Sequence, residues 1–67
     1  MPKCKIKIKD LYLKDYFRNK DGSFLLIEFH DDVYCEFESG EEACKMKEAI
    51  TRELAIPENE INVYMVE

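Results

Sequence analysis

The sequence predicts an α+β fold, in which an antiparallel β-sheet of the meander type carries one α-helix on one face and ends in a C-terminal strand. Two observations support this prediction. Hydrophobic and polar residues alternate over several stretches, which is the period of a strand with one buried face. One later stretch has the period of an amphipathic helix and a helix-start signal. The expected order is β-β-β-α-β in a single small domain covering residues 1–67.

The N-terminal third predicts two strands. Cys4, Ile6 and Ile8 alternate with lysines, which indicates a half-buried strand that ends where Asp10 breaks the phase. Residues 11–18 are ambiguous, because they also fit a short helix capped by Asp10. We favour an extended segment, bulged or bent near Asp10, that enters a hairpin. The turn composition of residues 19–23 supports this choice, since its glycine readily adopts positive φ.

Residues 24–37 are expected to form the centre of the sheet. Residues 24–30 and 33–37 both alternate, and Asp31-Asp32 separates them, so the pattern predicts a β-hairpin between these two runs. Leu25, Ile27 and Phe29 share one face of the first run and are expected to point inward.

Residues 39–55 form the expected helix. Ser39 is a candidate N-cap, and Glu42 three residues later completes a capping box. Pro57 stops the helix, and residues 61–66 alternate as the last strand. The residues expected to be largely buried are Ile27, Phe29, Phe37, Ile50, Leu54 and Val63.

Composition restricts the cellular setting. The three cysteines form no C-x-x-C pair, which favours reduced thiols and a cytoplasmic location. No apolar run approaches the ~20 residues of a membrane span, so no membrane partner is expected. The net charge of −5 is unevenly distributed, because the first 20 residues hold seven basic and two acidic residues. Such asymmetry is compatible either with an interaction face or with lysines and glutamates on neighbouring strands.

No catalytic or metal-binding signature is present. Cys4, His30, Cys35 and Cys44 lack the spacing that lets one turn present two zinc ligands. Both glycines have a turn or helix-start explanation, so a phosphate-binding loop is not indicated. We therefore expect no metal, no cofactor and no enzymatic activity.

One resemblance implies a different function. The beginning, MPKCKIKI, and the end, EAITRELAIPENEINVYMVE, resemble the two ends of a small tautomerase subunit. This resemblance implies that Pro2 would be a catalytic general base through its free amine. The chain departs from the family pattern because a hairpin region separates the first strand from the helix.

The main functional prediction is a non-catalytic module that binds another protein, or a second copy of itself, in a regulatory, inhibitor-like or adaptor-like role. Alternation leaves apolar and aromatic side chains on the sheet face away from the helix, unless residues 11–17 cover it. The predicted partner-binding residues are Phe24, Leu26, Glu28, His30, Tyr34 and Tyr64.

Nucleic acid is the alternative partner. Basic residues interleave with Tyr12, Tyr16 and Phe17, which is a mixture suited to phosphate contacts and base stacking. The possible basic contacts are Lys5, Lys7, Lys9, Lys14 and Arg18. A further alternative is an acidic inhibitor that imitates nucleic acid and binds a basic protein groove.

Overall fold

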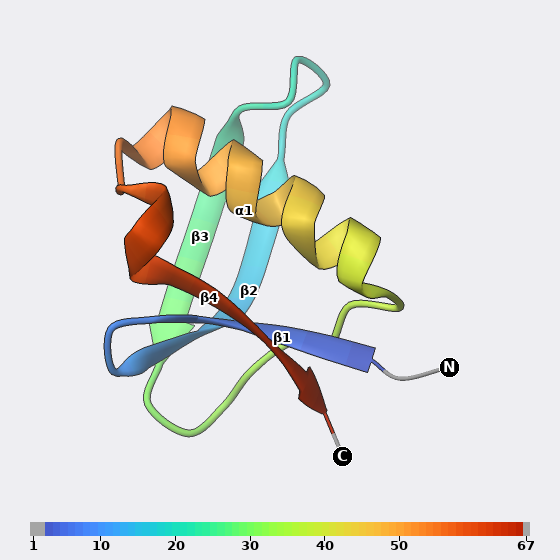
Figure 1. The fold of residues 1–67 in the computed structure, drawn as a ribbon. Helices are drawn as coiled ribbons and strands as arrows, with labels where there is room; N and C mark the ends of the chain where they lie inside the picture. The colour runs from blue at the N-terminus through green and yellow to red at the C-terminus, as the bar shows by residue number, and fades with distance from the viewer. Residues whose placement is uncertain (1–2, 67) are drawn as a thin grey trace.

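The computed structural model describes residues 3–66, which form four strands, one α-helix and one short 3-10 helix. These elements are β1 (Lys3–Ile8), β2 (Leu11–Arg18), β3 (Phe24–His30), α1 (Gly40–Leu54), η1 (Glu58–Glu60) and β4 (Ile61–Val66). The strands lie in the order β3-β2-β1-β4, and all neighbouring strands are antiparallel. The predicted α+β class and element order are therefore confirmed, and α1 crosses one side of the sheet (Figure 1).

The sheet bends sharply at β2. β1 pairs with β2 at two positions, where Lys7 faces Tyr12 and Ile8 faces Leu11. Beyond these positions β2 leaves β1 and continues alongside β3, so β2 and β3 cross β1 and β4 steeply (Figure 1). Residues 11–18 are thus a strand of the sheet, as favoured from the sequence, and they do not fold over its outer face.

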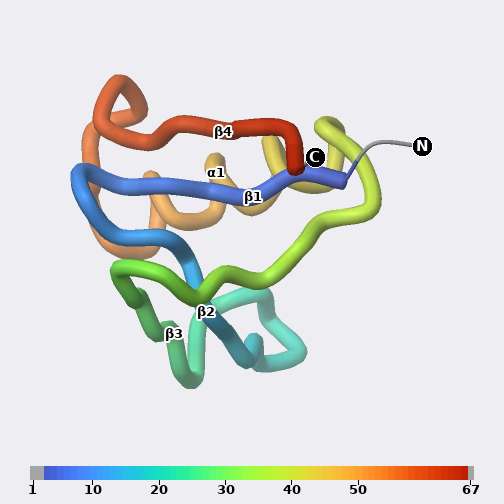
Figure 2. Tube along the Cα trace, turned by 90° about the horizontal axis from the view of Figure 1, so that it is seen from below, coloured from blue at the N-terminus to red at the C-terminus, as the bar shows by residue number. Residues whose placement is uncertain are grey.

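The predicted hairpin between residues 24–30 and 33–37 is wrong. β3 pairs with β2, and residues 31–37 instead run beside β1 in the space that β2 leaves open (Figure 2). The backbones of Cys4 and Phe37 exchange two hydrogen bonds of 2.9 and 2.7 Å, and the Cys35 N–H donates to the Leu13 carbonyl at 3.0 Å. β3 consequently lies at an edge of the sheet rather than at its centre.

The helix begins and ends as the sequence predicts. The hydroxyl of Ser39 accepts a hydrogen bond from the Glu42 N–H at 3.3 Å, and the Glu42 carboxylate accepts one from the Glu38 N–H. The Glu42 N–H is one of the amide hydrogens that have no partner within the helix, whereas Glu38 precedes the N-cap, so the return contact of the predicted capping box reaches the amide before that of Ser39. At the other end, Ala55 takes the left-handed conformation, with φ of 55°, and Pro57 follows two residues later.

The core lies between α1 and the concave side of the bent sheet. Fully or nearly fully buried side chains include Cys4, Ile6, Ile8, Leu13, Phe37, Ala43, Met46, Ala49, Ile50 and Ile61. The predicted burial of Phe37 and Ile50 is confirmed, whereas Ile27, Phe29 and Val63 are only partly buried against this core. Leu54 is 36% exposed, so its predicted burial is wrong. It is the last helical residue and lies one turn beyond Ile50.

Within residues 3–66, no helix combines the length and the apolar character needed to cross a membrane.

Candidate functional site

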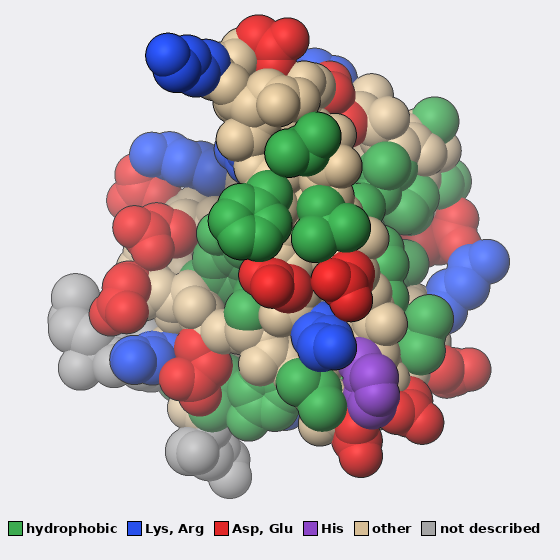
Figure 3. Space-filling model, turned by 180° about the vertical axis from the view of Figure 1, so that it is seen from behind, with side chains coloured by type: hydrophobic (Ala, Val, Ile, Leu, Met, Phe, Trp, Pro, Cys, Tyr) green, Lys and Arg blue, Asp and Glu red, His purple; other side chains and the backbone are tan. Residues whose placement is uncertain are grey.

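An exposed apolar pair lies on the outer face of β2 and β3, the face opposite α1. Phe17 on β2 is paired with Leu26 on β3, and these side chains are 60% and 42% exposed. The next pair on the same face is Asp15 with Glu28, both exposed. We call these four residues the outer patch. Hydrophobic side chains gather beside acidic ones on this side of the molecule (Figure 3).

Two irregularities in the β2–β3 pairing determine which side chains reach this face. The first leaves Lys14 without a paired residue, and the second leaves Leu25 without one. Each extra residue reverses the alternation, because successive side chains point to opposite faces. Leu25 is therefore 73% exposed instead of pointing inward as predicted.

Phe24 changes face for the same reason, so its predicted place on the outer face is wrong. It packs against the core, with its ring centre 6.5 Å from that of Tyr16 in an edge-to-face arrangement. The Arg18 guanidinium lies 5.4 Å from the Phe24 ring centre and donates two hydrogen bonds to the Gly22 carbonyl, at 2.9 and 2.7 Å. Arg18, predicted as a basic contact, thus stabilises the turn between β2 and β3 through these contacts.

A second group of side chains lies on the outer side of β1. The Lys5 ammonium is 4.5 Å from the Tyr34 ring centre and 4.8 Å from that of Tyr12, and the Lys7 ammonium is 5.2 Å from the Tyr12 ring centre. The two rings are 5.6 Å apart. We call these four residues the basic–aromatic cluster. Its tyrosine faces attract the lysine charges electrostatically.

The structure places the remaining predicted contacts separately. Tyr64 on β4 faces Lys5 across the strand pair and is 46% exposed, at the border of the basic–aromatic cluster. The Lys9 ammonium lies 3.5 Å from a Glu60 carboxylate oxygen, and the Lys14 ammonium lies 3.9 Å from Glu28. The five predicted basic residues therefore do not form one continuous patch.

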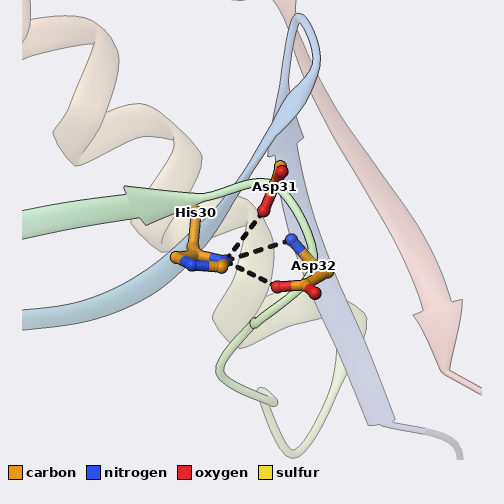
Figure 4. A group of neighbouring side chains, drawn as sticks. All are labelled: His30, Asp31 and Asp32. Carbon is orange, nitrogen blue, oxygen red and sulfur yellow. Dashed lines mark hydrogen bonds and ion pairs between the residues drawn. The ribbon is translucent and has the colours of Figure 1, made fainter.

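His30 ends β3 beside two acidic residues. Its Nδ1 atom lies 2.7 Å from an Asp32 carboxylate oxygen and 3.1 Å from an Asp31 oxygen, and the Asp32 N–H is 3.2 Å away (Figure 4). A protonated Nδ1 donates to the carboxylates, whereas an unprotonated one accepts from the amide. Potential metal-ligand atoms of the three side chains lie within 4.8 Å of one another, but both aspartates are exposed. The contacts of His30 with Asp31 and Asp32 connect the end of β3 to the turn that follows it, which accounts for the cluster without a metal ion.

The cysteines do not join this histidine. Within residues 3–66, no group of three or more potential metal ligands includes a cysteine. Cys4 is buried, Cys35 is partly buried and Cys44 is exposed, and all three are free thiols. Burial raises the pKa of the Cys35 thiol above its ordinary value, so this side chain behaves as a small apolar group near neutral pH. Pro2, the residue implied by the tautomerase resemblance, lies outside the described residues.

Phe17 belongs to the outer patch although the sequence did not predict it there. It lies in residues 11–18, whose pattern also fits a short helix, and only its pairing with Leu26 brings the two side chains together.

Comparisons with family models, curated proteins and solved structures find no match to this chain.

Proposed function

We propose that the chain is a non-catalytic module that binds another protein, or a second copy of itself, through the outer patch. The observation that carries this proposal is the side-by-side exposure of Phe17 and Leu26 on a sheet face that no other described segment covers. An aromatic and an aliphatic side chain next to the exposed carboxylates of Asp15 and Glu28 have the composition of a small interface centre with polar residues at its border.

The edge position of β3 supports the same surface. β3 has seven residues, carries one acidic and no lysine residue, and has a neighbouring strand on one side only. An open strand edge offers backbone N–H and C=O groups to an extended partner segment. Contacts to the outer patch and to this edge are therefore available to the same partner.

The setting that we propose is a reduced compartment such as the cytoplasm. The support is the free state of Cys4, Cys35 and Cys44, which matches proteins held under reducing conditions. A regulatory, inhibitor-like or adaptor-like role is the corresponding proposal for a small module that binds without catalysing a reaction.

The test is a Leu26→Asp substitution compared with Leu54→Asp. The two leucines have similar exposure, 42% and 36%, but Leu54 lies at the end of α1. Both variants should keep the wild-type circular dichroism spectrum. Leu26→Asp should abolish self-association measured by sedimentation or recovery of the partner that co-purifies with the wild type, because burying an unpaired carboxylate at an interface centre is costly. Equal association of wild type and both variants would contradict the proposal.

A second candidate function is contact with single-stranded nucleic acid through the basic–aromatic cluster. Within residues 3–66, Lys5 and Lys7 have no carboxylate oxygen within 4.0 Å, and tyrosine rings adjoin both ammonium groups. Lysine charge together with aromatic faces is the combination that single-strand binding uses. The chain's net charge of −5 opposes phosphate binding, so this function ranks second.

Fluorescence anisotropy with a labelled oligonucleotide tests this candidate. The double variant Lys5→Ala/Lys7→Ala should lose affinity, whereas Lys45→Ala/Lys47→Ala on α1 should not. Binding should also weaken steeply as salt is raised, because it depends on phosphate contacts. If both double variants bind equally, the cluster is not a nucleic-acid site.

A further inference from the structure

An apolar pocket lies away from the outer patch, at the end of the molecule where α1 terminates. Its volume is about 420 Å³. The β1–β2 turn, the C-terminal end of α1 and the segment leading into β4 meet on this side, as two views show (Figures 1 and 2). The apolar wall consists of Ile8, Leu11, Phe29, Ala55, Ile56 and Pro57. This volume and composition are typical of small-molecule sites.

Two residues with positive φ, Lys9 and Ala55, position the chain segments that line the pocket. Lys9 takes a left-handed conformation, with φ of 57°, so the chain reverses directly from β1 into β2 and presents Leu11 beside Ile8. Ala55 has a similar conformation and turns the chain out of α1 toward Pro57. Leu11 remains 44% exposed, and Phe29 and Ile56 are only partly buried. The pocket therefore leaves apolar surface accessible to a ligand.

The electrostatic surroundings of the pocket favour a cation. The pocket adjoins the C-terminal end of α1, which is the negative end of the helix dipole. Glu60 also lines it. Glu58 lies in the same 3-10 helix, but its carboxylate is 4.0 Å from the Lys47 ammonium, so Glu60 is the acidic residue on which the charge argument rests. The one basic residue in the lining is Lys9, whose ammonium is 3.5 Å from a Glu60 oxygen. This part of the pocket thus already holds one ammonium group, supplied by an exposed and replaceable side chain.

We propose that the pocket binds a small molecule with an apolar aryl or alkyl body and a single ammonium group. The apolar body lies against Leu11, Phe29 and Ile56, and the ammonium takes the place of the Lys9 ammonium beside Glu60. A ligand carboxylate would be repelled by Glu60 and by the negative end of α1, and Lys9, the lining residue that could attract it, is already paired with Glu60 in a chain of net charge −5. This site is separate from the outer patch and independent of the proposed protein-binding function.

Two probes with the same apolar body and opposite charge test the proposal: 4-phenylbutylamine and 4-phenylbutyrate. Each is titrated into the ¹⁵N-labelled protein while the backbone amide shifts are followed. The amine should shift amides of residues 8–11 and 55–60 in a saturable manner, and the carboxylate should bind more weakly. No saturable shift with the amine up to about 10 mM, a range that covers millimolar binding, would overturn the proposal, as would equal affinity for both probes.

Variants test the role of the charged pair. Glu60→Gln should weaken amine binding by about two- to fivefold, the effect of one exposed charge pair. Lys9→Gln should strengthen it, because the competing ammonium is gone. Glu41→Gln at the start of α1 removes a carboxylate that lies 3.7 Å from the Lys45 ammonium, outside both the pocket and the outer patch; it is the matched control and should bind as the wild type. Unchanged affinity in both Glu60→Gln and Lys9→Gln would refute the placement of the ammonium, and the dispersion of the amide spectrum verifies that each variant is folded.

Discussion

Replacing Phe37 by alanine tests the finding that its side chain belongs to the buried core. Phe37 is 6% exposed, and its ring stacks on that of Tyr16 with centres 6.1 Å apart. Removing a buried phenylalanine ring costs about 3–5 kcal/mol, from lost burial and the cavity left behind. A chain of 67 residues has a total stability of about 3–10 kcal/mol at the usual ~0.05–0.15 kcal/mol per residue. Phe37→Ala should therefore remove a large part of the stability, or all of it.

Phe17→Ala is the matched control, because it removes the same ring from a position that is 60% exposed. It should change the free energy of unfolding by less than about 1 kcal/mol, as is usual for surface substitutions. Urea denaturation followed by circular dichroism measures both variants. Similar losses for the two would refute the assignment of Phe37 to the core and Phe17 to the surface.

The remaining predictions concern ionisation and backbone conformation. Burial raises the pKa of Cys35, so the folded state holds the thiol proton more tightly than the unfolded state. This stabilisation is complete below the unfolded pKa of about 8.5 and is lost as pH rises through the folded-state pKa. The wild type should therefore lose more stability between about pH 7.5 and about pH 10 than Cys35→Ala does, as measured by urea denaturation; parallel losses would contradict the assignment. Gly22 has φ of 93°, and an added Cβ would lie 3.3 Å from an Arg18 nitrogen, so Gly22→Ala should cost at least about 1 kcal/mol. Gly40→Ala, where the added Cβ would meet the Cys4 sulfur at an ordinary 4.0 Å, should be neutral or stabilising, and a comparable loss at both glycines in thermal unfolding would contradict this account.

The sequence predicted the elements whose signals are local. The capping box at Ser39 and the apolar spacing along α1 specify the helix without reference to other segments. β1 and β4 are similarly regular, and their alternation matches their observed pairing, Cys4 with Met65 and Ile6 with Val63. The predicted inward residues of β1, Cys4, Ile6 and Ile8, are all buried. On β4 Ile61 is buried and Val63 is partly buried, whereas Met65, predicted to point inward, is 65% exposed near the end of the strand.

Features that depend on distant partners were not predicted. The alternation of residues 33–37 correctly predicted that Phe37 is buried. It did not identify the neighbouring segment, because Phe37 pairs with Cys4 on β1 and not with β3. The unpaired residue Leu25 turns the Phe24 side chain from the outer face to the core side of the sheet. No pattern in the neighbouring sequence predicts this irregularity. The candidate surface was therefore predicted only in part: Leu26 is exposed as expected, whereas its neighbour Phe17 depends on the β2–β3 register.

The pairing of β1 with β4 has a consequence for how the chain reaches its folded state. Paired residues are separated by between 53 positions, for Ile8 and Ile61, and 63 positions, for Lys3 and Val66. Closing so large a loop lowers the conformational entropy of the chain before the β1–β4 contacts can stabilise it, and this slows folding. The β2–β3 hairpin and α1 depend on near neighbours and are available early. β1 must wait for β4, so during synthesis on the ribosome the lysine-bearing strand stays without its principal neighbour until residues 61–66 have emerged.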